Sequence, residues 1–253
     1  MRIMRNYINI IEELSLNAWP AYQTELYDGW LLRYSKNYTH RTNCVNIVGQ
    51  STISITEKIE YCQQQYFSRN TPAIFKISPI MNPPLDKLLD QQGYDIQHIT
   101  DTFVLRKEDF SPLINPELEV HLEDSISREW IHALFCLNGT NNLEHRLIVP
   151  TMYQAIPKQT ICAYISIDNT IVATGLGIID RDHVGIYAIY IHPDYRSRQL
   201  GKTICSSILQ SAFNKGIHHA YLQVVTDNNI AKHVYHSIGF KDLYTYWFRC
   251  KNQ

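Results

Sequence analysis

The stretch Ile189-Tyr-Ile-His-Pro-Asp-Tyr-Arg196-Ser-Arg-Gln-Leu-Gly201-Lys-Thr-Ile decides the fold of the second half of the chain. It begins as an apolar strand that ends at His192-Pro193, continues as a turn rich in cations, and becomes a helix near Leu200. The N–H groups in the first turn of a helix have no partner inside the helix, and the helix dipole adds partial positive charge there. The turn is therefore predicted to bind a phosphate group, with glycine letting the backbone come close to it.

A second stretch downstream runs Asn228-Asn-Ile-Ala-Lys-His-Val-Tyr-His-Ser-Ile-Gly-Phe240, which indicates a helix closed by glycine and then a strand. Together, the two stretches resemble the GCN5-related N-acetyltransferase superfamily. The first family motif, R/Q-x-x-G-x-G/A after a strand, matches Arg196 to Gly201 except that Gln199 replaces the first glycine. The second, N-x-x-A-x-x-x-Y-x-x-x-G-F, is matched throughout. The resemblance covers about Leu118 to Arg249.

The resemblance implies transfer of an acetyl group from acetyl-CoA to a primary amine of a small molecule or peptide. The amine would attack the thioester directly, without a covalent enzyme intermediate. Tyr235 is the candidate general acid for the departing thiolate, with packing or cofactor contact as the alternative role. Asn228 would hydrogen-bond the cofactor or cap its helix. The cofactor-binding residues that the resemblance implies are Ile189, Ile191, Arg196, Ser197, Arg198, Gln199, Leu200, Gly201, Lys202 and Asn228.

The general base is not evident from the sequence. Many relatives carry a glutamate on the strand before the turn, but Val184–Ile191 contains no acidic residue. Tyr187, Tyr190 and His192 are the polar-capable residues there, and in a regular strand the odd spacing of the two tyrosines places them on opposite faces. His192 is more typical of a turn residue than of a catalyst, and a water relayed through the backbone or a tyrosine is an equal alternative for the base. The missing carboxylate leaves open a second class of function, a non-catalytic acyl-CoA-binding regulatory protein. An acyl group longer than acetyl is a further alternative.

The whole chain of 253 residues has the pattern of an α/β protein. Two prolines in Lys107–Glu117 predict a boundary there, between a domain at 1–110 and a catalytic domain at 118–253. Helices are predicted at 3–16, 54–68, 83–92, 125–137 (capped by Ser125), 142–155, 200–215 and 228–237. Strands are predicted at 30–34, 44–48, 73–77, 103–105, 160–167, 171–178, 183–191, 220–225 and 244–249.

The two halves end alike, which suggests a degenerate internal duplication. Each ends with a helix closed by a glycine and an aromatic residue, Gly93-Tyr94 and Gly239-Phe240, and then a strand that ends in arginine. Two tandem domains of one superfamily are expected, although two unrelated domains that both end in a helix and a strand would look similar. The first half has no arginine-glycine turn, so it is expected to have lost the cofactor site and to shape the acceptor site.

Candidate acceptor-binding residues lie in the first half. Trp30, Arg33 and Arg41 belong to a cluster rich in aromatic and cationic residues, and arginine suits an amine that also carries a carboxylate. The plainer interpretation is that the arginines are solvated and the aromatic residues belong to the core.

Composition narrows the class of protein. A net charge of −1 gives no general attraction to nucleic acid or anionic membranes. The six cysteines form no CxxC pair, which favours free thiols in a reducing compartment over disulfides or a metal site. No secretory signal or membrane-spanning run is apparent. These features predict a cytoplasmic protein, for which a homodimer is possible.

Overall fold

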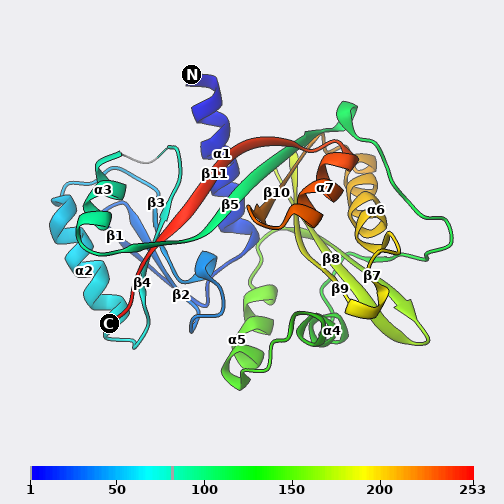
Figure 1. Ribbon diagram of the computed structural model, residues 1–253, viewed down its shortest axis with the longest axis horizontal. Helices are drawn as coiled ribbons and strands as arrows, with labels where there is room; N and C mark the ends of the chain where they lie inside the picture. Colours follow the sequence, from blue (N-terminus) through cyan, green and yellow to red (C-terminus); the bar gives the residue numbers. More distant parts are fainter. Residues whose placement is uncertain (1, 81–82) are drawn as a thin grey trace.

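The computed structural model describes residues 2–80 and 83–253, and the strands of these residues form one mixed sheet of 11 (Figure 1). The first half contains α1 (Arg2–Ala18), β1 (Gln23–Tyr27), β2 (Trp30–Tyr34), β3 (Val45–Ile47), α2 (Ile55–Phe67), β4 (Ala73–Ile77), α3 (Pro83–Gln91) and β5 (Asp95–Arg106). The second half contains β6 (His121–Glu123), α4 (Arg128–Asn138), α5 (Leu143–Gln154), β7 (Gln159–Ile167), β8 (Thr170–Asp180), β9 (His183–Ile191), α6 (Leu200–Asn214), β10 (His219–Val225), α7 (Asn229–Ile238) and β11 (Lys241–Lys251).

The last strands of the two halves are exchanged. The sheet order is β1-β2-β3-β4-β11-β5-β10-β9-β8-β7-β6, so β11 lies beside β4 of the first half and β5 lies beside β10 of the second. The strands β5 and β11 also pair with each other, antiparallel, at the centre of the sheet (Figure 1). The sheet is therefore continuous across the proposed boundary at Lys107–Glu117.

Both halves repeat one topology. In the first half, β1, β2 and β3 are antiparallel neighbours and β4 pairs with β3 in parallel. In the second half, β7, β8 and β9 are antiparallel neighbours and β10 pairs with β9 in parallel. The helices α3 and α7 both end at a glycine with positive φ, +78° at Gly93 and +112° at Gly239. This repetition supports a duplication within a tandem fold.

Helices cover both faces of the sheet. Residues that alternate along β4 show this, since Phe75 packs in the cluster of α2 and α3 while Ile74 packs in the cluster of α1. The helices α6 and α7 cover the second half on the α2 side, and α4 and α5 lie on the α1 side. The helix α1 spans the junction of the halves, where buried Ile11 and Leu14 lie in one cluster with residues of β10 and β11.

Several local features differ from the sequence predictions, among them the short strand β6, which was not predicted. Strand β1 was not predicted, because it is an edge strand whose side chains are mostly exposed and polar. Strand β5 begins at Asp95 rather than near Phe103, because its first residues are exposed and lack an apolar pattern. The cap of α4 is Ser127, whose Oγ accepts the Trp130 N–H at 3.1 Å, rather than Ser125.

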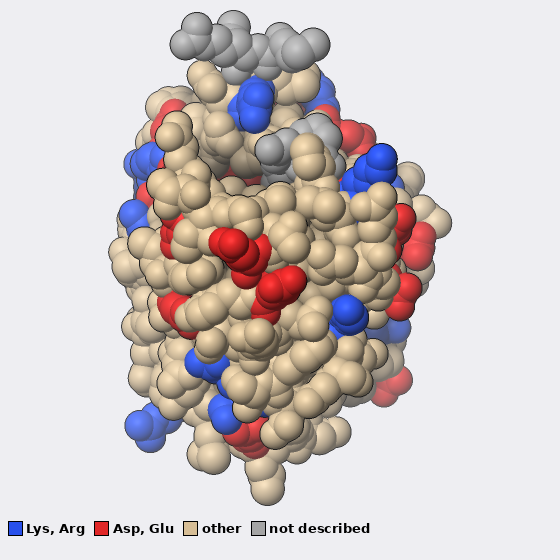
Figure 2. All heavy atoms as spheres, turned by 90° about the vertical axis from the view of Figure 1, so that its left-hand side faces the viewer, with Lys and Arg blue, Asp and Glu red and all other residues tan. Residues whose placement is uncertain are grey.

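The surface on the side of α2 and α3 carries both signs of charge. Figure 2 shows acidic and basic side chains scattered over a larger uncharged area on this side. None of the helices in residues 2–80 and 83–253 combines the length and the apolar character that a membrane crossing requires. The same residues contain no group of three or more His, Cys, Asp or Glu side chains that could hold a metal ion.

Candidate functional site

A gap opens between β9 and β10 at the centre of the second half. The two strands are paired in parallel from His183↔His219 to Ile186↔Leu222, and β9 then continues to Ile191 beyond this pairing. The His192 N–H donates to the Val172 carbonyl at 2.8 Å, on the β8 side. Backbone groups of successive residues in an antiparallel strand point to alternate sides. The N–H and carbonyl of Ile191 therefore point toward the gap, where an extended ligand could pair with them.

The cation-rich turn lies between β9 and α6. A short 3-10 helix, Pro193–Tyr195, follows β9, and the exposed residues 196–199 lead into α6. The first backbone bond of α6 joins the Thr203 N–H to the Gln199 carbonyl at 3.0 Å, so the N–H groups of residues 200–202 precede the helical ladder. The first turn of α6 contains no acidic residue, and the guanidinium of Arg198 lies 5.1 Å from the ring centre of Tyr195. Of the predicted cofactor residues 196–202, the first four are exposed and the turn is positively charged, whereas the Leu200 side chain is buried at 2% exposure and leaves only its backbone for a ligand.

The backbone at position 199, where this chain departs from the family motif, explains why the motif has glycine there. Gln199 has φ +65°, in the left-handed region that favours glycine, and the fold imposes this conformation although the residue has a side chain. Gly201 does not have positive φ, and a Cβ there would meet only Ile191 side-chain atoms, at 3.9 and 4.0 Å. Packing of the protein therefore does not require glycine at position 201, and the open space beside it can receive a ligand.

The helix α7 positions the second motif beside this gap. Asn228 caps the helix, because its Oδ1 accepts the Ala231 N–H at 3.1 Å. Tyr235 is half-buried and packs against the same cluster as Ile189 and Ile191. Burial raises the pKa of Tyr235 above its ordinary value, and the nearby Cys205 and Tyr190 raise it further, so the phenol stays protonated at neutral pH. Among the described residues its hydroxyl has no hydrogen-bond partner, which leaves its O–H available to a ligand.

The structure separates the three candidate acceptor-binding residues. Trp30 is 2% exposed and lies in the core of the first half. Arg33 is 3% exposed, and its guanidinium donates to the carbonyls of Trp19 and Arg41. Burial lowers the pKa of Arg33, but these two carbonyls solvate its charge. Arg41 is half-buried, and its guanidinium reaches Gln223 of β10 across the junction of the halves.

In the first half, the loop before α2 corresponds to the cation-rich turn before α6, and the carboxylate of Asp28 occupies it. The loop before α2 directs the N–H groups of Thr52 and Ile53 to the carboxylate of Asp28, both at 2.9 Å to Oδ2, and Lys58 Nζ lies 3.3 Å from the same oxygen. Hydrogen bonds from the Ile53 and Thr52 N–H groups hold the pKa of Asp28 well below its usual range. The anion-binding position before α2 is therefore filled from within the protein.

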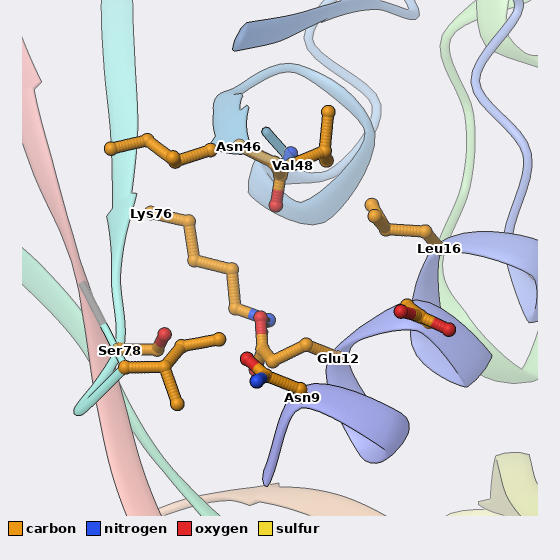
Figure 3. Close-up of a pocket in the computed structure, with 10 residues that line it drawn as sticks. Asn9, Glu12, Leu16, Asn46, Val48, Lys76 and Ser78 are labelled. Carbon is orange, nitrogen blue, oxygen red and sulfur yellow. Dashed lines mark hydrogen bonds and ion pairs between the residues drawn. The ribbon is translucent and has the colours of Figure 1, made fainter. Parts of the chain in front are cut away.

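A cavity of about 270 Å³ lies at the ends of β3 and β4, the counterparts of β9 and β10 (Figure 3). Lys76 of β4 reaches across it to Glu12 of α1, with Nζ at 2.8 and 2.7 Å from the two carboxylate oxygens. The Tyr244 hydroxyl also donates to Glu12. Glu12 and Glu13 line this cavity and make it unfavourable for a phosphate. The sequence analysis did not identify the cavity, because its residues come from segments that are far apart in the chain.

The fold and a family match together place the chain in the GCN5-related N-acetyltransferase superfamily. A family described as the C-terminal part of the probable histone acetyltransferase Rv0428c matches residues 6–248, and the chain belongs to this family. The expectation of a tandem member of the superfamily is confirmed.

Relatives cover most of the chain. An N-acetyltransferase of Bacillus subtilis strain 168, YobR, which is described as uncharacterized, is 23% identical over 253 residues, covering 96% of this chain and 98% of its own. A GCN5-related N-acetyltransferase from Kribbella flavida superposes with a TM-score of 0.71 at 15% identity, covering 97% and 94% of the two chains. A tandem protein of the same superfamily from the clavulanic acid biosynthesis pathway superposes with a TM-score of 0.62 at 9% identity, covering 81% and 73%.

Proposed function

We propose that the protein transfers an acetyl group from acetyl-CoA to a primary amine of a small molecule or peptide. The carrying observation is that the gap between β9 and β10 opens directly onto the positively charged turn 196–202. One extended ligand with a pyrophosphate can contact both parts at once. In this proposal the Ile189–Ile191 backbone pairs with the pantetheine, and the α6 N–H groups hold the pyrophosphate with Arg196, Arg198 and Lys202 as counter-charges.

The proposed reaction is a direct attack on the thioester. A bond forms between the amine nitrogen and the acyl carbon, the carbon–sulfur bond breaks, the nitrogen loses a proton and the sulfur gains one. Tyr235 would donate its O–H to the departing sulfur, since its hydroxyl has no hydrogen-bond partner among the described residues. Burial raises the pKa of Tyr235 and makes it a weaker acid, so the proton would move as the carbon–sulfur bond breaks and negative charge develops on the sulfur. Tyr187 does not serve as the base, since burial raises its pKa to about 12 and its O–H donates to Tyr221 at 2.9 Å.

One observation favours a second function. Strand β9 carries no carboxylate, so the residue that relatives use as a base is missing. A non-catalytic protein that binds acyl-CoA and reports its level would need the cofactor gap but no base. This alternative predicts that the protein binds acetyl-CoA and that no amine accelerates the consumption of acetyl-CoA.

The cofactor assignment is tested by calorimetry with acetyl-CoA. Wild type is compared with Gly201→Glu, which places a negative charge at the start of α6, and with Gln210→Glu, which adds the same charge at an exposed position further along this helix. We expect binding by wild type and Gln210→Glu and a loss of about 100-fold or more in affinity for Gly201→Glu. Equal binding by all three proteins would contradict the placement of the pyrophosphate, and no wild-type binding to acetyl-CoA or longer acyl-CoAs would refute the cofactor itself.

A further inference from the structure

A single arginine spans the junction of the halves beside the proposed acyl site. Arg41 belongs to the 3-10 helix His40–Thr42 of the first half, yet its Nη1 lies 3.4 Å from the Oε1 of Gln223. Gln223 is the residue of β10 that follows Leu222, the last one paired with β9. Arg41 therefore lies where the two strands separate, on the α1 side of the sheet.

The guanidinium of Arg41 lacks an anionic partner. In residues 2–80 and 83–253 no carboxylate lies within ion-pair distance of it, and its one side-chain bond, to Gln223, is long. The same Gln223 Oε1 also accepts the Tyr246 O–H at 3.2 Å. By contrast, the guanidinium of Arg249 forms two ion pairs, from Nε to Asp86 Oδ1 and from Nη1 to Asp90 Oδ1, each at 2.7 Å. Since a half-buried charge without a partner is costly, Arg41 is poised for an anion that the protein does not supply.

Tyr153 is buried in one hydrophobic cluster against which Tyr38 and Tyr187 pack, on the α1 side of the sheet, where Arg41 meets Gln223. The charge of Arg41 acts on Tyr38, Tyr153 and Tyr187, where it lowers the pKa of each phenol against the larger rise from burial. The phenol of Tyr190 also raises the pKa of Tyr38 and of Tyr153. The hydroxyl of the buried Tyr153 donates to no residue that the structure describes. We call these residues the Arg41 cluster: Arg41, Gln223, Tyr38, Tyr153, Tyr187 and Tyr190.

We infer that the Arg41 cluster binds a carboxylate of the amine acceptor, so that the acceptor is an amino acid or the free carboxyl end of a short peptide. The inference rests on the proposed acetyl transfer. One guanidinium balances a monoanion, and its planar fork matches the two oxygens of a carboxylate. The hydroxyls of Tyr153 and Tyr190 can add neutral donors, while the rings offer an apolar surface to the side chain of the acceptor.

The test compares matched amines. Rates of acetylation are measured for a panel of amino acids and for the amines that differ from them only by loss of the carboxylate. The proteins are wild type, Arg41→Gln, Arg41→Lys and the control Arg128→Gln, which changes an exposed arginine on α4. We expect wild type and the control to prefer the carboxylate form by about tenfold or more in kcat/KM, Arg41→Gln to lose this preference, and Arg41→Lys to keep part of it.

Acetyl-CoA affinity and the thermal midpoint are measured on the same samples. A wild-type enzyme that favours the amines without a carboxylate, or an Arg41→Gln variant that keeps the full preference while folded, would overturn the inference. If no amine is acetylated, the amino acids are titrated into the acetyl-CoA complex by calorimetry. Binding that Arg41→Gln abolishes supports the carboxylate site without catalysis, and absence of binding overturns it. Failure of acetyl-CoA binding itself would instead count against the proposed function.

Discussion

Tyr187 and Tyr190 lie on the same face of β9, although three positions separate them. Tyr187 pairs with Leu176 and Tyr190 pairs with Thr174, so Ala188 and Ile189 together oppose the single residue between those partners. This is a β-bulge, and Ala188 has φ +51° there. A regular strand would have separated the two phenols. The bulge places both phenols on the α1 side of the sheet, where β9 extends beyond its pairing with β10.

The bulge predicts a specific response at Ala188. Glycine adopts a positive φ without cost, whereas a β-branched residue is strongly disfavoured there. We expect Ala188→Gly to leave the free energy of unfolding unchanged or raise it by up to ~1 kcal/mol, and Ala188→Val to lower it by roughly 2 kcal/mol. Urea unfolding measures both, and acetyl-CoA affinity should fall only for the valine variant. Equal stability of the two variants would contradict a left-handed backbone at this position.

Gln199 gives a second test of backbone conformation. Its φ of +65° places a long side chain where the family motif has glycine. We expect Gln199→Gly to raise the free energy of unfolding by roughly 0.5 to 1 kcal/mol, because the strain removed exceeds the added chain entropy. The matched control is Gln210→Gly within α6, which should lower stability by about 1 kcal/mol. A Gln199→Gly variant that loses stability like the control would show that position 199 is not left-handed.

Much of the secondary structure could be predicted because each element carries its own local signal. Strand β2 begins and ends where the pattern predicted it, and Asp168-Asn169 form the hairpin turn between the strands predicted at 160–167 and 171–178, with φ of +50° and +60°. The same holds for the cation-rich turn, whose residues are consecutive in the chain. Asn228 was predicted to have two alternative roles, and the structure shows one of them, the helix cap.

Other features depend on contacts between distant segments and could not be read locally. The exchange of β5 and β11 is an example, since both strands follow a glycine-closed helix and either could pair with β4 or β10. The bulge at Ala188 is another, because alanine gives no sign of positive φ. The Arg41 cluster combines residues of both halves, so only the fold reveals that Arg33 serves the core while Arg41 faces the junction.

Tyr235→Phe tests the proposed acid. The ring would keep its packing beside Phe240, whose centroid lies 6.0 Å away, and no protein hydrogen bond of the described residues would be lost. We expect kcat to fall by about 10- to 100-fold at saturating acetyl-CoA, with cofactor affinity within about twofold of wild type. Unchanged turnover, under conditions where chemistry limits the rate, would remove Tyr235 as the acid and leave it a packing role.

His183, at the start of β9, is expected to make the folded protein less stable in acid. His183 is 8% exposed, neither ring nitrogen has a hydrogen-bond partner among the described residues, and its ring stacks on His219 at 5.0 Å. Burial, with His219 as the second cause, lowers the pKa of His183 to about 4 from its ordinary 6.5. Between these values the unfolded chain binds a proton that the folded protein does not, so stability falls as pH falls through this window.

We expect this histidine to remove roughly 2 kcal/mol of the free energy of unfolding between pH 7 and pH 5, since one pKa unit corresponds to about 1.4 kcal/mol. Urea unfolding at both pH values measures the loss in wild type, in His183→Phe and in a control, His233→Phe, which changes an exposed histidine on α7. The His183→Phe variant should lose less stability in acid than wild type by that amount, because phenylalanine takes no proton, while the control should follow wild type. If all three proteins lose the same free energy, then His183 is not held neutral in the fold, and the acid sensitivity must arise elsewhere.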